Sequence, residues 1–205
     1  MLIKRQAEIT FFAQSFGNLQ NISGNMRIKK DNTIGVVIDI QEKLYPFIHD
    51  HEILTRNNKI LINGLKALDI PLVVTQQYTK GLGETIPEIR EVLGEFKYIE
   101  KTAFSCCDEP RFNEAVAILA KMYVVVTGIE AHVCVMQTVN DLIGQGYIPV
   151  VVEDCIGSRK PNDKKIAVER MRQSGAIITT YESILFELLK YSGTDEFREI
   201  SRLVK

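Results

Sequence analysis

Short apolar runs rich in β-branched residues alternate along this chain with longer stretches of helical pattern. This alternation constrains the fold more than any other feature of the sequence. Runs that lack a period of two are typical of strands buried on both faces, and such strands need helices above and below the sheet. Five runs are strongly apolar and the one at 96–100 is weaker. The expected strands are 34–39, 70–75, 96–100, 122–127, 148–153 and 176–180.

Helical patterns fill the segments between these runs and follow the last one. Alternating strands and helices of this length predict an α/β fold with a doubly wound, six-stranded parallel sheet. Gly146 and Gly175 each stand where a left-handed helix C-cap is expected. Asn162 or Asp163 is the expected cap of the helix that follows Pro161. The expected helices are about 52–68, 86–93, 110–120, 132–145, 162–174, 181–190 and 194–204.

The chain has 205 residues, which fits one domain, and its first 30 residues do not share the αβ alternation. We therefore expect an N-terminal arm over 1–30 and a single domain over 31–205. Phe11, Phe12 and Phe16 make the arm apolar enough to pack on a neighbouring subunit. This favours a homo-oligomer, either a dimer or a larger closed assembly.

Composition excludes several classes of function. Lysine and arginine number 25 and aspartate and glutamate 26, so the net charge of −1 gives no support for a nucleic-acid or anionic-membrane surface. No stretch approaches the roughly 18 apolar residues of a membrane span, and the first residues do not resemble a signal peptide. The four cysteines contain no C-x-x-C pair, which indicates a reduced, cytoplasmic protein. The three histidines lack metal-ligand spacing, so neither a metal nor another cofactor is expected.

Three reactive residues follow expected strands at the carboxyl edge, where open α/β sheets bind ligands. Asp39 ends the first strand, Lys101 follows the weak third strand, and Cys134 follows the fourth. Each has an ordinary alternative: a turn or capping aspartate, a solvated surface lysine, or a small buried hydrophobe. Position alone leaves these alternatives open.

Cys134 lies just beyond a glycine turn, in or near the first turn of an expected helix. Free N–H groups and the positive end of the helix dipole favour a thiolate there, so its pKa is expected to be lowered. Cys155 also ends a strand but has no glycine turn before it, which makes it the natural comparison. Cys106 and Cys107 lie in a loop.

Five segments of the chain resemble the isochorismatase-like cysteine hydrolase family, and most closely its isochorismatase-domain-containing subgroup. They follow one another in the family's order between about 34 and 190, with 1–30 outside the resemblance. The segments are 37–41 (VIDIQ), 74–83 (VTQQYTKGLG), 101–105 (KTAFS), 128–134 (GIEAHVC) and 169–176 (ERMRQSGA).

The resemblance implies a three-layer αβα fold and a catalytic triad formed by Asp39, Lys101 and Cys134. It also implies a cis peptide between Ile129 and Glu130, a bond that is costly for residues other than proline. An oxyanion hole would then form from the N–H of Cys134 and that of Val133 or Glu130. We expect the substrate pocket to be lined by Gln77, Tyr78 and His132.

Two departures from the family pattern narrow the expected substrate contacts and metal dependence. The subgroup usually has an acid where this chain has Gln76, and a proline where it has Thr79. Nicotinamidases of the wider family carry an Asp-x-His metal pattern after the second strand, and this chain has no histidine there. The sequence therefore predicts a metal-independent cysteine hydrolase that cleaves a small amide or other C–N acyl substrate through a thioester.

Two other functions compete with this prediction. One is a catalytically silent scaffold or interaction protein on the same fold, because a fold does not imply a function. The other is a redox-active thiol protein that uses Cys106 and Cys107, or Cys134.

Overall fold

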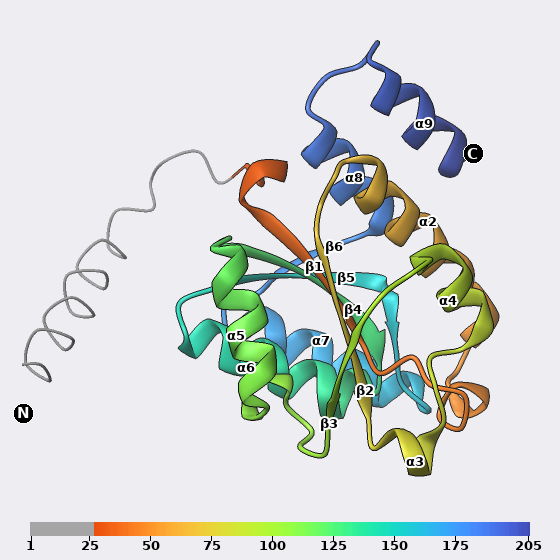
Figure 1. The fold of residues 1–205 in the computed structure, drawn as a ribbon, viewed down its shortest axis with the longest axis vertical. Helices are drawn as coiled ribbons and strands as arrows, with labels where there is room; N and C mark the ends of the chain where they lie inside the picture. The colour runs from red at the N-terminus through yellow and green to blue at the C-terminus, as the bar shows by residue number, and fades with distance from the viewer. Residues whose placement is uncertain (1–26) are drawn as a thin grey trace, which may run out of the picture.

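The computed structural model describes residues 27–205 and contains one sheet of six parallel strands (Figure 1). The strand order is β3-β2-β1-β4-β5-β6, which confirms the predicted doubly wound α/β architecture. Each expected strand is present, with its ends moved by a few residues. The strands are β1 (Thr33–Ile38), β2 (Leu72–Gln77), β3 (Tyr98–Lys101), β4 (Tyr123–Ile129), β5 (Ile148–Gly157) and β6 (Ile177–Thr179).

Helices cover both faces of the sheet and complete the three layers (Figure 1). One layer contains α2 (His51–Ala67), α4 (Pro87–Leu93), α8 (Tyr181–Leu189) and α9 (Asp195–Leu203). The opposite layer contains α5 (Pro110–Leu119), α6 (Met136–Gly144) and α7 (Pro161–Gln173). Short helical turns complete the described chain: η2 (Lys30–Asn32), η3 (Tyr45–Phe47), α3 (Thr79–Leu82), η4 (Cys106–Asp108) and η5 (Ala131–Val135).

The central strand β1 shows why the sheet needs helices on both sides. All six of its residues are buried. Ile34, Val36 and Ile38 join the apolar cluster that includes α5, α6 and α7, while Val37 packs in the cluster that includes α2 and α4. Alternate side chains of a strand point to opposite faces, so an apolar run without a polar face has to lie between two helical layers.

The observed helix ends agree in part with the caps predicted from the sequence. Gly146 and Gly175 have φ angles of 88° and 105°, which confirms the two left-handed C-caps. The capping prediction for α7 is wrong, because this helix begins at Pro161 with Lys160 as its N-cap. Asn162 and Asp163 therefore lie inside its first turn.

The proposed arm lies mostly outside the described residues, including Phe11, Phe12 and Phe16. Its last four residues, 27–30, are described and belong with the domain. Ile28 is only 2% exposed and packs in the cluster that includes α2 and α8, and its N–H donates to Glu187 at 2.8 Å. Over 27–205, no helix is both long and apolar enough to span a bilayer.

Candidate active site

The strands β1 and β4 lie side by side, yet the helices that follow them cover opposite faces of the sheet. This is a topological switch point, where the two connections diverge and a crevice forms beyond the carboxyl ends of the strands. Asp39 follows β1 directly. Cys134 follows β4, inside the single π turn η5 that leads into α6. The fold therefore brings together two residues that stand 95 positions apart.

Gly128 permits the close approach of these two strands. It pairs in register with Ile38, and a Cβ at this position would lie 2.3 Å from the Ile38 carbonyl oxygen. Its φ of 147° is also a conformation that residues with side chains rarely adopt. The glycine in the GIEAHVC segment thus seats the Cys134 loop against the end of β1.

Lys101 reaches the same place from two strands away. It is the last residue of β3, and its side chain extends past β2 to place Nζ 2.6 Å from Asp39 Oδ2. Both side chains are buried, with 0% and 1% exposure. Nζ also lies 2.7 Å from Gln77 Oε1 and within 3.1 Å of the carbonyl oxygens of Ala103 and Phe104.

The ammonium group of Lys101 is stable in spite of this burial. Loss of solvent lowers the pKa of Lys101, but the negative charge around it, that of Asp39 first, raises the pKa above its usual value. The sequence alternative of a solvated surface lysine is therefore wrong. Four oxygen atoms around one buried ammonium group also satisfy its hydrogen-bonding capacity.

Asp39 is held in a defined orientation by its two oxygen atoms. Oδ2 faces Lys101, and Oδ1 accepts a hydrogen bond of 2.7 Å from the Thr75 hydroxyl. The backbone of Asp39 is left-handed, with a φ of 52°. The sequence analysis did not identify Thr75, because its contact with Asp39 depends on the pairing of β2 with β1, in which Thr75 is in register with Ile38.

Cys134 is 5% exposed, and its Sγ lies 3.6 Å from Gln77 Oε1. Burial, followed by the charge of Asp39, raises the pKa of the Cys134 thiol, while Lys101 opposes the shift. The expectation of a lowered pKa is therefore wrong. Desolvation and a neighbouring carboxylate outweigh the helix terminus here, so the resting group is a thiol.

A second thiol, Cys106, lies beneath the same cluster. It is fully buried, and its Sγ is 3.8 Å from the Thr75 hydroxyl oxygen. Burial and the charge of Asp39 raise the pKa of Cys106 to about 12. The hydroxyl of Thr138 accepts from the Cys106 N–H at 2.9 Å and donates to the Cys134 carbonyl at 2.7 Å. These bonds attach the loop after β3 to the turn that carries Cys134.

The expected cis peptide is absent. The part of the chain described here has only trans peptides, so the bond between Ile129 and Glu130 is trans. The turn is made instead by Glu130 in a left-handed conformation, with φ 57° and ψ 56°. The N–H of Val133 donates to the Glu130 carbonyl at 2.8 Å, which removes Val133 from the predicted oxyanion hole.

The Glu130 carboxylate forms a second charged group behind the Cys134 turn. It is 6% exposed and lies 2.8 Å from Arg159 Nε, although neither oxygen accepts a well-aligned hydrogen bond from the residues that the structure places. His132 belongs to this group. Its Nδ1 is 3.0 Å from Ser158 Oγ and 3.5 Å from Glu130, and its Nε2 is 3.9 Å from Asp163.

Gln77 is the last residue of β2 and Tyr78 follows it, and the two residues differ in their surroundings. Gln77 is buried, and its side-chain nitrogen donates to the Thr102 carbonyl at 2.8 Å. Tyr78 is 52% exposed in a left-handed conformation, with its ring so close to Gly81 that a Cβ there would lie 2.2 Å from it. Of the three expected pocket-lining residues, Tyr78 is the one with an exposed side chain.

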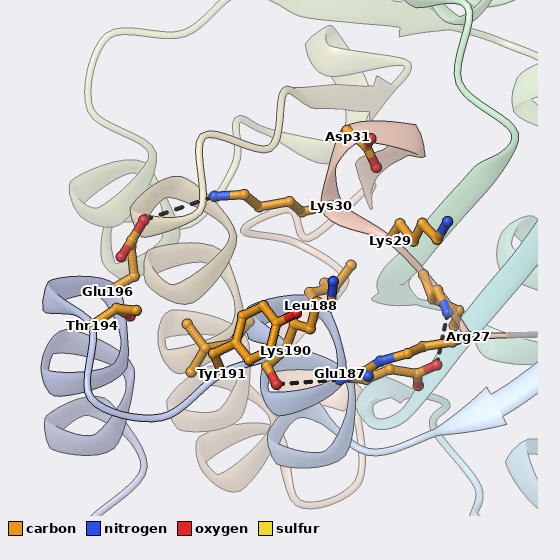
Figure 2. A pocket seen from close by; sticks show the side chains of 12 residues that line it. Arg27, Lys29, Lys30, Asp31, Glu187, Leu188, Lys190, Tyr191, Thr194 and Glu196 are labelled. Carbon is orange, nitrogen blue, oxygen red and sulfur yellow. Dashed lines mark hydrogen bonds and ion pairs between the residues drawn. The ribbon is translucent and has the colours of Figure 1, made fainter.

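The opposite edge of the sheet carries a cavity of about 610 Å³ that none of the catalytic candidates lines (Figure 2). It lies between residues 27–31, at the start of β1, and the end of α8. Two of its charged residues, Lys30 and Glu196, form an ion pair of 3.8 Å. Between residues 27 and 205 there is no group of three or more His, Cys, Asp or Glu side chains that could hold a metal ion.

The fold and the buried cluster define a three-layer α/β protein with an acid, a lysine and a thiol at the switch point of its sheet. The isochorismatase domain model matches residues 33–183, and the chain belongs to the isochorismatase family. Isochorismatase domain-containing protein 1 of Danio rerio is 38% identical over 168 residues, which cover 82% of this chain and 59% of that protein. This similarity agrees with the predicted subgroup.

Two solved structures extend the comparison. The MAR1 ribonuclease of Caenorhabditis elegans has a TM-score of 0.82 and 38% identity, covering 87% of this chain and 92% of that one. The YcaC gene product of Escherichia coli, an octameric hydrolase of unknown specificity, has a TM-score of 0.82 at 22% identity, covering 88% and 92%. The second likeness concerns the fold alone.

Proposed function

We propose that this chain is a metal-independent cysteine hydrolase that cleaves a small amide, or another C–N acyl substrate, through a thioester on Cys134. The observation that carries the proposal is the meeting of three groups at the switch point. The Lys101 ammonium lies 2.6 Å from Asp39 and 2.7 Å from Gln77 Oε1, and the Cys134 thiol lies 3.6 Å from the same Gln77 oxygen. Family membership supports the broader assignment to a hydrolase.

The first half-reaction forms the thioester. Because Cys134 is a thiol at rest, Asp39 accepts its proton as the sulfur attacks the carbonyl carbon and a C–S bond forms. Lys101 stays protonated and balances the negative charge that passes from Asp39 to sulfur. The carbonyl oxygen becomes an oxyanion, and the N–H of Cys134 is its proposed donor. When the tetrahedral intermediate collapses, the C–N bond breaks and Asp39 returns the proton to the departing nitrogen.

The second half-reaction regenerates the thiol. A water molecule gives a proton to Asp39 as its oxygen attacks the thioester carbonyl. The C–S bond then breaks, the acid product leaves, and the proton on Asp39 returns to sulfur. The balance requires one water for each C–N bond and no metal or redox partner.

The test is hydrolysis of a panel of small carboxamides and ureides, measured as ammonia or amine release, with intact-mass analysis of the protein. We expect turnover of at least one compound, an acyl adduct on Cys134, and unchanged rates after treatment with a chelator. The proposal fails if no compound is cleaved and Cys134 does not react with thiol probes, which would favour the silent scaffold. Loss of activity on chelation and its return with metal would contradict metal independence.

RNA is the second candidate substrate because the nematode structure with 38% identity is named a ribonuclease. A net charge of −1 gives no general attraction for a polyanion. A labelled single-stranded RNA therefore belongs in the panel. Its cleavage by the intact chain, lost in Cys134→Ala, would assign the site to RNA instead.

Two further expectations stay with this proposal. The arm phenylalanines and the octameric YcaC neighbour support a homo-oligomer. The cysteine usage supports a cytoplasmic location. Sedimentation of the full chain and of a chain without residues 1–25 tests the first.

A further inference from the structure

We propose that Gln77 is a positioning residue of the catalytic cluster, whose side-chain oxygen holds the Lys101 ammonium and the Cys134 thiol in place, and that it does not serve as a substrate contact. The inference rests on the function proposed above and replaces the expectation that Gln77 lines the substrate pocket. Four features of the structure support it.

The strand order places Gln77 between the groups that it contacts. It is the last residue of β2, and β2 lies between β1 and β3 in the sheet. Gln77 pairs in register with Lys101, so both side chains point to the same face of the sheet. The lysine therefore passes beside Gln77 on its way to Asp39.

One oxygen of Gln77 accepts from both groups. Gln77 Oε1 lies 2.7 Å from Lys101 Nζ and 3.6 Å from Cys134 Sγ. The second distance is within the range expected of a hydrogen bond to sulfur. Because a carbonyl oxygen has two lone pairs, these two donors use its hydrogen-bonding capacity fully.

The orientation of the amide is fixed from both ends. Its nitrogen donates to the Thr102 carbonyl at 2.8 Å. Rotation of the amide would place that nitrogen against the Lys101 ammonium, donor against donor, and would leave the Thr102 carbonyl facing an oxygen. The hydrogen-bond network therefore selects a single orientation.

The backbone of Gln77 is also clamped, by Gln41. Gln41 Oε1 accepts from the Gln77 N–H at 2.7 Å, and Gln41 Nε2 donates to the Gln77 carbonyl at 3.0 Å. With its backbone and its side chain both engaged, Gln77 has the rigidity that a positioning residue needs. A residue that is only 8% exposed and whose side-chain oxygen is engaged is poorly suited to recognise a substrate.

The neighbouring Gln76 supplies a matched control. It is equally a buried glutamine on β2, but its amide contacts the hydroxyls of Thr85 at 3.0 Å and Thr79 at 3.1 Å and not the catalytic cluster. Hydroxyls can donate to a carboxylate, so Gln76→Glu introduces the same charge on the same strand without unpaired oxygens. It isolates the effect of position from the effect of buried charge.

The experiment measures the rate of Cys134 alkylation by iodoacetamide from pH 6 to pH 10 in the full chain, with site-specific mass spectrometry. In Gln77→Glu we expect labelling at pH 7.5 to fall at least tenfold and the rise with pH to move by more than one unit to alkaline values. A carboxylate beside the sulfur disfavours the thiolate. Gln76→Glu should retain the wild-type profile. Cys155, fully buried in another cluster, reports any loss of folding by becoming labelled.

If Gln77→Glu exposes Cys155, Gln77→Asn carries the test instead. Shortening the side chain withdraws the oxygen from both donors, and labelling at pH 7.5 should rise at least threefold, because the thiol loses an acceptor that favours its neutral form. A wild-type profile in the folded Gln77 variant overturns the inference and restores a substrate-contact role, which a small alkylating agent does not sense. An equal shift in Gln76→Glu also overturns it. Absence of Cys134 labelling in the wild-type chain would instead overturn the proposed function, and the inference with it.

Discussion

The ends of β4 and β5 carry two cysteines in very different surroundings. Cys155 lies in β5, fully buried in the apolar cluster beneath α8, and burial, followed by the charge of Asp154, raises its pKa. Cys134 follows β4 and is almost as buried, and its pKa is also raised. Neither thiol is ionised at rest. Cys155 also has a carboxylate and an ammonium group nearby, those of Asp154 and Lys164. The difference is that the carboxylate and the ammonium group beside Cys134, those of Asp39 and Lys101, are joined in a buried ion pair of 2.6 Å.

This comparison shows that the pKa of a buried sulfur does not by itself identify a nucleophile. What distinguishes Cys134 is that its base and its cation are held together in one buried ion pair, so that Asp39 can take the proton and Lys101 can balance the charge once the proton has moved. Cys155 has neither Asp39 nor Lys101 among the groups that shift its pKa.

The sharpest test of the difference is removal of each sulfur in turn. For any amide that the wild-type chain hydrolyses, Cys134→Ala should lower kcat by roughly a thousandfold or more, because no other group can form the thioester. Cys155→Ala should leave kcat within about twofold, since it only removes one sulfur atom from a buried apolar cluster. Steady-state rates on the same substrate decide the matter. Equal losses in the two variants would remove the distinction between the two strand ends.

The charged pair beside Cys134 also separates the two regions in stability. Lys101→Met leaves Asp39 buried without its cation, and we expect the free energy of unfolding to fall by about 3–5 kcal/mol. The matched control is Lys59→Met, which removes the exposed partner of Glu91 in a pair of similar length, 3.1 Å. That change should cost less than about 1 kcal/mol. Urea denaturation of both variants measures the difference. A small loss in Lys101→Met would mean that Asp39 is easily rehydrated.

Alkaline pH lowers the stability contributed by both regions. The fold raises the pKa of all four buried thiols, among them Cys106 to about 12, above their ordinary value of 9.0. Above pH 9 the unfolded chain loses these protons while the folded chain keeps them, so stability falls as pH rises. Each thiol contributes about 1 kcal/mol of this loss between pH 9 and pH 10. The raised pKa of Lys101 adds to the loss at higher pH.

The measurement is the urea midpoint at pH 7, 8, 9 and 10. Cys155→Ala should reduce the slope between pH 9 and pH 10 by one thiol's share. A stability curve that stays flat through pH 10 would show that the thiols are better solvated than their burial indicates.

The sequence predicted the strands and strand-end residues of the site better than the contacts between its side chains. The six apolar runs and the strand-end positions of Asp39, Lys101 and Cys134 follow from periodicity and from the rule that ligands bind at the carboxyl edge. The resemblance to a family then linked these three residues. Strand order was needed to turn this into geometry, because it decides which strand ends are neighbours.

Contacts made by side chains across strands were beyond the sequence. Thr75 and Gln77 contact the cluster only because β2 lies between β1 and β3, which no local pattern reveals. The pKa of Cys134 was predicted in the wrong direction. A helix terminus is visible in the sequence, whereas burial and the nearness of Asp39 are tertiary effects.

The effect of Asp39 on the two thiols supplies a smaller and less obvious prediction. Asp39 raises the pKa of Cys134 by its charge, and Lys101 lowers it. Asp39→Asn removes the opposing charge and leaves Lys101 to pair with the sulfur. We therefore expect iodoacetamide to label Cys134 about tenfold faster at pH 8, which corresponds to a pKa lower by about one unit. Cys155 should stay protected.

The same variant should lose hydrolysis while it gains alkylation, because the thiolate is then formed without a base to return the proton to the leaving nitrogen. An alkylating agent needs only the thiolate, whereas amide cleavage needs a proton delivered at the correct step. If alkylation of Cys134 falls in Asp39→Asn while Cys155 remains unlabelled, then Asp39 organises the site rather than opposing the thiolate, and the contrast between the two strand ends rests on Lys101 alone.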